Sequence, residues 1–475
     1  MAKLPTELLT SIFTYAYTDS RWTSSSKHES CPRLEQVLRE SIRCTCMKDE
    51  MSYTPKWKSY ELYSPTLFPY PLAAVCRQWR DVLEDVPVFW TRVVALIDRR
   101  PTDLSRLQKQ LQLSKDQPLD VFVLRRPDAY EDSDPREHDR CRSVINALMP
   151  HLQRCRSISF DVIDTSSLPS ISHDFRGSAP LLTSLTLNAR KDDGKASGDW
   201  NSVSMPQSIE NPFKCPNLTS IDIDGRNFVY ACLDLPSWRD SLQSIPGKTG
   251  LSRLTLSNFS PGSAEKDYEL TGNDILEILM ALRLSFLSFN NVDFSSDVLS
   301  LGIPQINAIS LSATGLRASF MTLLLHGLSY HSPASIHIER CELVDAVAPF
   351  SHCLSLTDIS AEVDMESFLD HWGGYVLHVL RCPAFNDWVL CSYRPDPSRP
   401  FWLNIEDCEA FTVAGLRALV QMIREEQPME NVTYEVRVSG WGPRAPTDAE
   451  MEWFETHLDR FRWDAKERHE KMLLP

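Results

Sequence analysis

The chain is 475 residues long and carries a formal net charge of −15, and its composition is 42% hydrophobic and 9% aromatic. This composition is typical of a globular protein, and the length exceeds that of one small domain. The acidic balance disfavours a general nucleic-acid-binding protein, which needs a basic surface to neutralise phosphates. The sequence shows no apolar run of transmembrane length and no secretory signal pattern, so we expect a cytoplasmic or nuclear protein without a membrane partner.

Two short amphipathic helices are predicted near the N-terminus. Pro5 suits the first turn of a helix, and an apolar stripe at helical spacing follows it, made by Leu8, Leu9, Ile12, Phe13 and Ala16. The second helix has a similar stripe, made by Leu72, Val75, Cys76, Trp79 and Leu83. Helices this short are not stable alone, so they must pack on each other or on a partner. The periodicity by itself is also that of an ordinary helical hairpin.

The residue types in these helices form an ordered motif. Residues 4–13 read Leu-Pro-x-Glu-Leu-Leu-x-x-Ile-Phe, residues 75–80 read Val-Cys-Arg-x-Trp-Arg, and Phe89-Trp90 follows. This set resembles an F-box, and the stretches 104–111, 114–123 and 148–158 resemble the segments that follow the box in a large fungal F-box-like family. The resemblance implies a Skp-type adaptor, and through it a cullin, as partners. It also implies that these residues contact the adaptor: Leu4, Pro5, Leu8, Leu9, Ile12, Phe13, Val75, Cys76 and Trp79.

The two halves of the motif are separated by a polar insertion at about 18–70, longer than is usual in that family. Cys44-x-Cys46, with Cys31 and His28 upstream, is the best metal candidate, but its spacing fits a zinc site poorly. We expect the insertion to be metal-free and the protein to need no cofactor. The aromatic side chains of 57–63 form either a recognition patch or a cover over the box helices, and both alternatives stay open.

A weak repeat begins at about residue 118. Its core is apolar-x-x-apolar-x-apolar, as in Leu182-x-x-Leu185-x-Leu187, Leu218-x-x-Ile221-x-Ile223, Leu251-x-x-Leu254-x-Leu256, Leu284-x-x-Leu287-x-Phe289 and Ile306-x-x-Ile309-x-Leu311. Amphipathic helices are predicted between instances, at 274–284, 316–328, 365–372 and 413–424. Strand and helix in alternation are typical of a leucine-rich-repeat solenoid. An unrelated α/β domain is the alternative.

In a solenoid the apolar strand residues point inward and the residues between them face outward. The inward set is Leu185, Leu187, Ile221, Ile223, Leu254, Leu256, Ile309 and Leu311. The outward set, which we expect to contact a target protein, is Thr186, Asp222, Thr255 and Ser310. Cys341, Cys382 and Cys408 follow three later strands, as in cysteine-containing repeats, where such a side chain satisfies backbone groups inside the turn.

A capping box at Thr447 and Glu450 predicts a last helix that carries Met451, Phe454, Leu458 and Phe461. The sequence therefore predicts an α/β protein. It consists of an α-helical F-box-like domain at 1–97, an irregular leucine-rich-repeat-like solenoid at 98–446 and a C-terminal capping helix at 447–475.

The expected function is that of a substrate-receptor subunit of a Skp–cullin–F-box ubiquitin ligase, without catalytic activity of its own. A non-ligase interaction scaffold that retains the helical element is the alternative. An enzyme of unrecognised type is a third hypothesis, which no motif in the sequence favours. The sequence does not identify the target.

Overall fold

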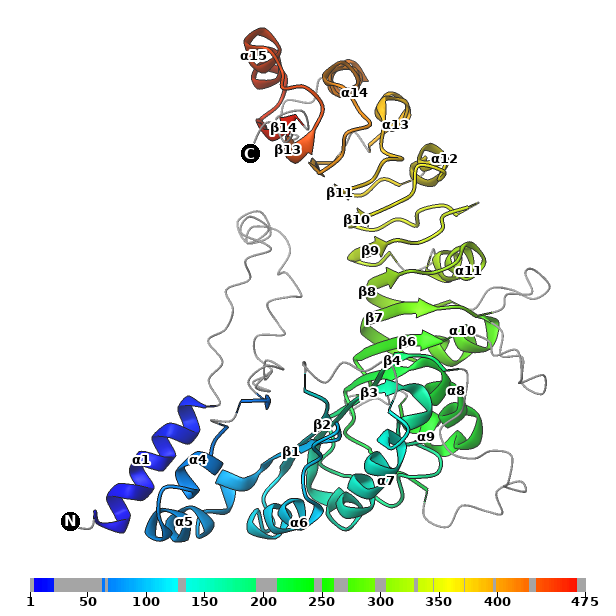
Figure 1. Ribbon diagram of the computed structural model, residues 1–475. Coiled ribbons are helices and arrows are strands. Elements are labelled where there is room, and N and C mark those ends of the chain that lie inside the picture. The colour runs from blue at the N-terminus through cyan, green and yellow to red at the C-terminus, as the bar shows by residue number, and fades with distance from the viewer. Residues whose placement is uncertain are drawn as a thin grey trace. The chain divides into compact units, whose positions relative to one another are not determined.

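The structure is a computed structural model, shown in Figure 1. It describes residues 4–20, 62–64, 67–126, 134–193, 212–242, 250–259, 272–294, 305–328, 332–344, 346–370, 372–395, 399–426 and 433–467. The metal candidates Cys31, Cys44, Cys46 and His28 lie outside these residues, as do residues 57–61 of the aromatic stretch.

The α/β prediction is confirmed. The fourteen described strands form one sheet, in which each strand is hydrogen-bonded to the next strand of the chain, from β1 to β14. The neighbouring strands run parallel, as in the pairs β1–β2, β4–β5 and β13–β14. The chain divides into two compact units, Met1–Ser159 and Phe160–Pro475, a division that falls later than the boundary expected after residue 97. Strand β3 (Cys155–Asp164) spans the division. Among the described residues, no helix has the length and apolar character needed to cross a membrane.

The first unit begins with helices and continues as alternating helices and strands. Its elements are α1 (Thr6–Asp19), α4 (Tyr70–Ala73), α5 (Arg77–Glu84), the 3-10 helix η3 (Pro87–Trp90), β1 (Arg92–Leu96), α6 (Leu104–Leu113), β2 (Leu119–Leu124), α7 (Glu137–Leu148) and the 3-10 helix η4 (Met149–Arg154). The single helix predicted across Leu72–Leu83 is wrong, because the chain breaks between α4 and α5. Cys76 is extended there, with φ −160° and ψ 169°. Val75 and Cys76 therefore precede α5 instead of lying on a helix.

The second unit alternates strands and helices. Its strands after β3 are β4 (Ser184–Lys191), β5 (Ser220–Asp224), β6 (Arg253–Phe259), β7 (Arg283–Val292), β8 (Asn307–Thr314), β9 (Ser335–Glu339), β10 (Cys353–Thr357), β11 (Val376–Leu380), β12 (Phe401–Glu406), β13 (Tyr434–Gly442) and β14 (Arg460–Glu467). Its helices are the 3-10 helix η5 (Thr165–Ser167), α8 (Gly225–Asp234), α9 (Pro236–Ser241), α10 (Gly272–Met280), α11 (Ala318–Leu328), α12 (Met365–Leu369), α13 (Asp387–Ser392), α14 (Val413–Glu426) and α15 (Asp448–His457). Side-chain caps start several helices, such as Asp224 at α8 and Asp364 at α12.

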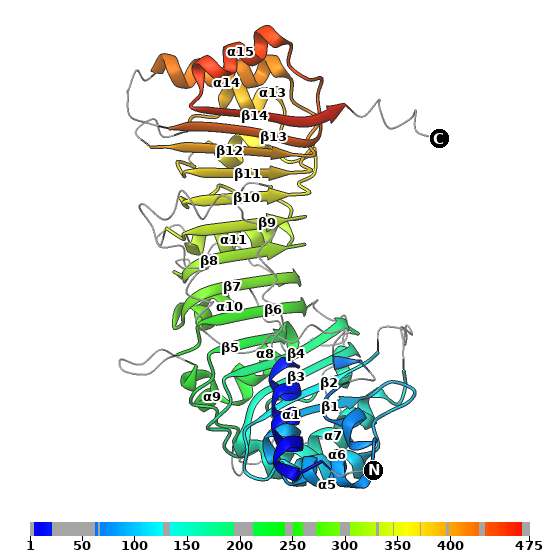
Figure 2. The ribbon, with the colours of Figure 1, turned by 90° about the vertical axis from the view of Figure 1, so that its left-hand side faces the viewer.

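Helices α10 to α14 lie along one side of the strands of this unit in Figure 1. Figure 2 looks onto the other side of the same strands, and no described helix of the second unit covers that side. We call it the open face. Successive side chains of a strand point to opposite faces, so the helix-covered side receives the buried apolar residues and the open face receives the residues between them.

The predicted stacking of the apolar strand residues is confirmed for β4 to β6. Leu185, Ile221 and Leu254 are partners in register, and all three are fully buried. The same row continues through Leu287 and Leu311. Each side chain thus packs on its neighbours in the adjacent strands, which is how repeats that cannot bury their own apolar face are stabilised.

Ile309 departs from this row. It was expected to point inward, but 41% of its surface is exposed, whereas Ala308, Leu311 and Ala313 are buried. The correct repeat in β8 is therefore Ala308-x-x-Leu311-x-Ala313, which is in register with Leu284-x-x-Leu287-x-Phe289 of β7. The sequence pattern favoured Ile306 and Ile309 because two isoleucines are a stronger apolar signal than two alanines.

Each strand of the later repeats ends in a left-handed residue. Asn291, Arg340, Asp358, Arg381 and Asp407 have φ between 50° and 53°. The N–H groups of Arg340, Asp358 and Arg381 donate to the carbonyl oxygen at the end of the next strand, at 2.9–3.0 Å. Glycines take the same position at Gly315 and Gly440. A Cβ at either glycine would come within 2.4 Å of the preceding repeat's Asn291 or Asp407 side chain, so only glycine fits there.

The C-terminal helix is shorter than predicted. The capping box of Thr447 and Glu450 is present, and α15 ends at His457. Residues from Arg460 form β14, which pairs with β13 over its full length. The prediction that Leu458 and Phe461 lie on a helix is wrong, because Phe461 occupies a strand and stacks on Phe454 of α15 at 4.4 Å between ring centroids. Alternation of apolar and charged residues over 460–467 was the signal for a strand.

Candidate functional site

Helix α1 divides its apolar side chains between two sides. Leu9 and Phe13 are fully buried, whereas Leu8 and Ile12 are each 52% exposed. The exposed apolar side chains recur every three or four residues along one side of the helix, and we call them the α1 face: Leu4, Leu8, Ile12 and Tyr15. Exposed apolar residues that are grouped in this way, unlike scattered ones, mark an interaction surface.

The buried side of α1 packs on an aromatic cluster. Phe13 meets Trp79 of α5 edge to face, with ring centroids 5.2 Å apart. Tyr17 contacts Phe89 of η3 at 5.3 Å. Buried aromatic pairs of this geometry contribute about 0.5–1.5 kcal/mol each beyond the area they bury. The indole N–H of Trp90 donates to the carbonyl oxygen of Leu83 at 2.8 Å, so the cluster also satisfies its polar group.

The beginning of α5 lies beside the beginning of α1. The side-chain amide of Gln78 donates to the carbonyl oxygen of Leu4 at 2.9 Å. Val75 and Cys76, just before α5, are exposed. The exposed members of the expected adaptor-binding set are therefore Leu4, Pro5, Leu8, Ile12, Val75 and Cys76. The other members are not exposed and pack between α1 and α5: Leu9, Phe13 and the half-buried Trp79.

Tyr15 was missed by the sequence reasoning. It is 77% exposed and continues the spacing of Leu8 and Ile12 by three residues. The stripe had been drawn through Leu8, Leu9, Ile12 and Phe13 as one surface. Leu8, Leu9, Ile12 and Phe13 together span about 140° of the helix circumference, at about 100° per residue. The packing of α5 therefore decides which edge of this stripe is buried.

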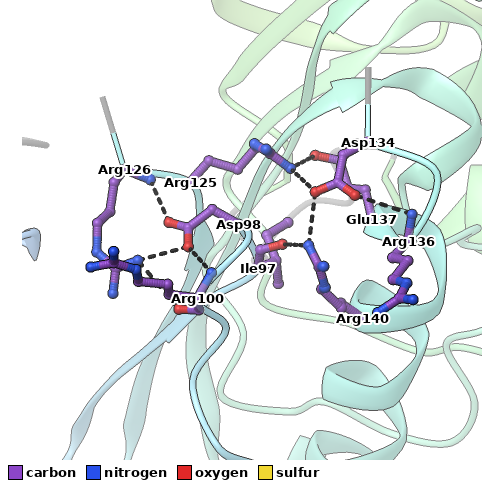
Figure 3. Close-up of polar contacts among 9 residues, drawn as sticks. All are labelled: Ile97, Asp98, Arg100, Arg125, Arg126, Asp134, Arg136, Glu137 and Arg140. Atoms are coloured by element: carbon purple, nitrogen blue, oxygen red, sulfur yellow. Dashed lines mark hydrogen bonds and ion pairs between the residues drawn. The ribbon is translucent and has the colours of Figure 1, made fainter. Parts of the chain in front are cut away.

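Arginines and carboxylates meet where β1 and β2 end (Figure 3). The guanidinium of Arg125, which is 1% exposed, lies 3.0 Å from Glu137 at the start of α7 and 3.1 Å from Asp134. Arg140 lies 2.7 Å from Asp134, and Arg126 lies 2.7 Å from Asp98. The carboxylates are paired with guanidinium groups, so this cluster ties α7 to the strand ends.

The charge pairs set the ionisation of the cluster. Burial opposes the ionisation of Asp134, but the N–H of Arg136 and the guanidinium groups of Arg125 and Arg140 outweigh it and lower the pKa of the carboxyl. Asp134 is therefore an anion between two arginines, and its role is structural.

The open face carries the residues expected to contact a target. Thr186, Asp222 and Thr255 are partners in register in one row that crosses the strands, and Ser310 lies in the neighbouring row. All four are partly exposed. Asp222 is engaged within the sheet, because the amide of Asn188 donates to it at 3.1 Å. Burial raises the pKa of the Asp222 carboxyl above its usual value, with the Asn188 hydrogen bond opposing the rise.

The three repeat cysteines lie inside the turns, as their positions predicted. The Cys341 sulfur accepts from the N–H of Leu316 at 3.4 Å, and the Cys382 sulfur accepts from the N–H of Ile359 at the same distance. The Cys408 sulfur accepts from the N–H of Cys382. Burial raises the pKa of the Cys341 and Cys408 thiols to about 11, so both remain protonated at neutral pH and act as structural groups.

Within the part of the chain that the structure describes, no group of three or more His, Cys, Asp or Glu side chains is placed to hold a metal ion.

In comparisons with known proteins, no family model matches the chain and no curated protein matches it significantly. The α1 face and the open face are thus the two candidate sites.

Proposed function

We propose that the protein is a substrate-receptor subunit of a Skp–cullin–F-box ubiquitin ligase. In this proposal the first unit docks on a Skp-type adaptor through the α1 face, and the open face of the second unit, a leucine-rich-repeat-like solenoid, holds a target protein. The ubiquitin-transfer chemistry belongs to other subunits, and this chain contributes binding alone.

The α1 face is the observation that carries the proposal. Leu4, Leu8, Ile12 and Tyr15 are exposed although the same helix buries Leu9 and Phe13 completely. A helix side that stays apolar without packing on its own unit is explained by a partner that covers it. The motif in which these residues stand resembles the one that binds this class of adaptor.

The test is co-purification with a Skp-type adaptor after substitution of the exposed side only. Leu8→Asp with Ile12→Asp would bury two unpaired carboxylates in the interface, which is costly, while both side chains are exposed in the free chain. We expect the double variant to fold and to lose the adaptor. Adaptor recovery at the wild-type level would refute the proposed docking surface.

A matched control comes from the second unit. Met280 and Val344 are as exposed as Leu8 and Ile12, at 55% and 58%. Met280→Asp with Val344→Asp should therefore leave adaptor binding intact. Cullin recovered with the adaptor supports the ligase assignment, whereas adaptor without cullin supports the interaction scaffold.

A further inference from the structure

An exposed tryptophan lies on the helix side of the second unit, by which we mean the side of the strands along which α10 to α14 lie in Figure 1. Trp388, in the first turn of α13, is 71% exposed, the highest exposure among the large apolar side chains described in this unit. Its indole N–H donates to the carboxylate of Glu366 on α12, which fixes the ring against the neighbouring repeat. An exposed tryptophan held in this way has the character of an interface anchor.

Two exposed valines extend this surface beyond α12. Val344 and Val347, which follow β9, are 58% and 41% exposed. Their segment joins α11 to α12, because the carbonyl oxygen of Val344 accepts from the Thr322 hydroxyl at 3.2 Å and the N–H of Ala348 donates to the carbonyl oxygen of Phe368 at 2.9 Å. The exposed apolar side chains thus come from the repeats on either side of α12, a grouping that marks an interaction surface.

Four carboxylates lie at α12 and at the start of α13. They are Glu362, Asp364, Glu366 and Asp387. Within the described residues, none of the four forms an ion pair with a lysine, arginine or histidine. Their hydrogen-bond donors are uncharged, such as the Ser367 hydroxyl at 2.7 Å from Asp364 and the Thr412 N–H at 2.6 Å from Asp387. These hydrogen bonds hold the carboxylates in place without neutralising them.

The arginines nearest to these carboxylates in the chain are engaged with other groups. Arg381, between β11 and α13, donates twice to Asp358, at 2.6 and 2.9 Å. Arg394, after α13, donates to the carbonyl oxygen of Cys391 at 2.8 Å. The surface from α12 to the start of α13 therefore carries an excess of negative charge, which favours a cationic partner.

Other aromatic rings of the second unit are covered by arginines. The guanidinium of Arg253 lies 5.0 Å from the centroid of the Phe286 ring, and that of Arg417 lies 4.6 Å from the centroid of Trp453. Among the described residues, no arginine or lysine lies over the ring of Trp388. A tryptophan face attracts a cation through its quadrupole, and the carboxylate at its edge adds to that attraction.

We propose that the surface made by Val344, Val347, Glu366 and Trp388 binds a segment of another protein that carries a lysine or arginine next to an aliphatic side chain. The cation lies over the Trp388 ring beside Glu366, and the aliphatic side chain packs on Val347. A second copy of the chain, docked through the same surface, is disfavoured because two acidic surfaces repel and the chain has a net charge of −15. The inference goes beyond the proposed function, since it concerns neither the α1 face nor the open face.

The test uses the full chain and a phage-displayed library of random twelve-residue peptides as the probe. We expect enrichment of peptides with Lys or Arg within a few positions of an aliphatic residue. A synthetic enriched peptide should lose about ten-fold in affinity with Trp388→Ala and with Glu366→Lys, as measured by fluorescence anisotropy. A peptide whose basic residue is changed to glutamate should bind Glu366→Lys better than it binds the wild type, a rescue that a merely structural Glu366 would not give.

A matched control lies on α10. Glu277 and Met280 are an exposed carboxylate and an exposed apolar side chain one turn apart on the same side of the strands. Glu277→Lys and Met280→Ala should leave peptide affinity unchanged. Equal losses for Glu277→Lys and Glu366→Lys would mean that overall charge alone attracts the peptide, and would overturn the proposal. No enrichment, enrichment of acidic peptides, or wild-type affinity in Trp388→Ala would overturn it as well.

Discussion

The α1 face and the open face differ in the side chains that they expose and in the secondary structure that carries them: a helix in the first case and a parallel sheet in the second. On α1 an apolar set is exposed, and it lies one residue away from side chains that are completely buried. On the open face the exposed residues are mostly polar, and the apolar residues between them are stacked beneath. A strand separates its two faces strictly by alternation, whereas a helix separates them by angle alone. The exposed residues are therefore easier to identify from sequence on the sheet than on the helix.

The sharpest test of this contrast on the helix compares two adjacent residues. Phe13→Ala should lower the free energy of unfolding of the first unit by about 4 kcal/mol, because it leaves a cavity beside Trp79. Ile12→Ala should change it by less than about 1 kcal/mol, since that side chain is half exposed. Urea unfolding, followed by tryptophan fluorescence, measures both. Equal losses of unfolding free energy in the two variants would show that Ile12 is buried to the same extent as Phe13.

The first unit also buries charge, which the apolar rows of the second unit do not. Glu137→Ala should cost about 3 kcal/mol, because it leaves the Arg125 guanidinium buried with Asp134 as its remaining carboxylate in Figure 3. Glu84→Ala is the control, since Glu84 pairs with the exposed Lys109 at 2.6 Å. An exposed pair contributes less than about 1 kcal/mol, and comparable losses in the two variants would argue against the buried network.

Sequence reasoning predicted the strands of the second unit better than the helical region for a physical reason. Leu185, Ile221 and Leu254 each lie in a local alternating pattern, and the parallel pairing of successive strands then fixes their partners. The break at Cys76 and the burial of Leu9 but not Leu8 depend on how α1, α4 and α5 pack, and no local pattern contains that information.

The exposed residues of β10 to β13 were not singled out from the sequence, for a related reason. Val376 and Trp402 are far apart in the chain and are joined only by the register of the strands. Their repeats also lack the full apolar-x-x-apolar-x-apolar core, which made the later strands harder to align by sequence. The cysteines after these strands were the more reliable marker, because their place in the turn is set by the unpaired backbone groups there.

A buried carboxyl in the second unit gives a pH-dependent test. Asp224 caps α8 by accepting from the N–H of Asn227 at 2.9 Å, and burial raises the pKa of its carboxyl to about 7. The unfolded carboxyl ionises near 3.8, so the folded state loses stability as pH rises from there to about 7. Asp224→Asn keeps the cap without the charge. Its gain in unfolding free energy should be about 2 kcal/mol larger at pH 8 than at pH 5.

The control for this test is the exposed cap at Asp103. Hydrogen bonds from Ser105 lower the pKa of the Asp103 carboxyl, so it is ionised in both the folded and the unfolded state at pH 5 and at pH 8. Asp103→Asn should therefore change stability equally at the two pH values. A gain for Asp224→Asn that does not depend on pH would mean that the buried carboxyl is not the cause.

The smallest expected effect tests the corrected register of β8. If Ile309 faces solvent, Ile309→Thr should change the free energy of unfolding by less than about 0.5 kcal/mol, because threonine keeps the β-branched shape that suits a strand. Ile221→Thr makes the same chemical change at a fully buried position of β5 and should cost several times more, since it places a hydroxyl in the apolar stack. Thermal unfolding of both variants decides the matter. A large loss for Ile309→Thr would restore the register read from the isoleucines, in which Ile309 points inward and packs in the apolar stack.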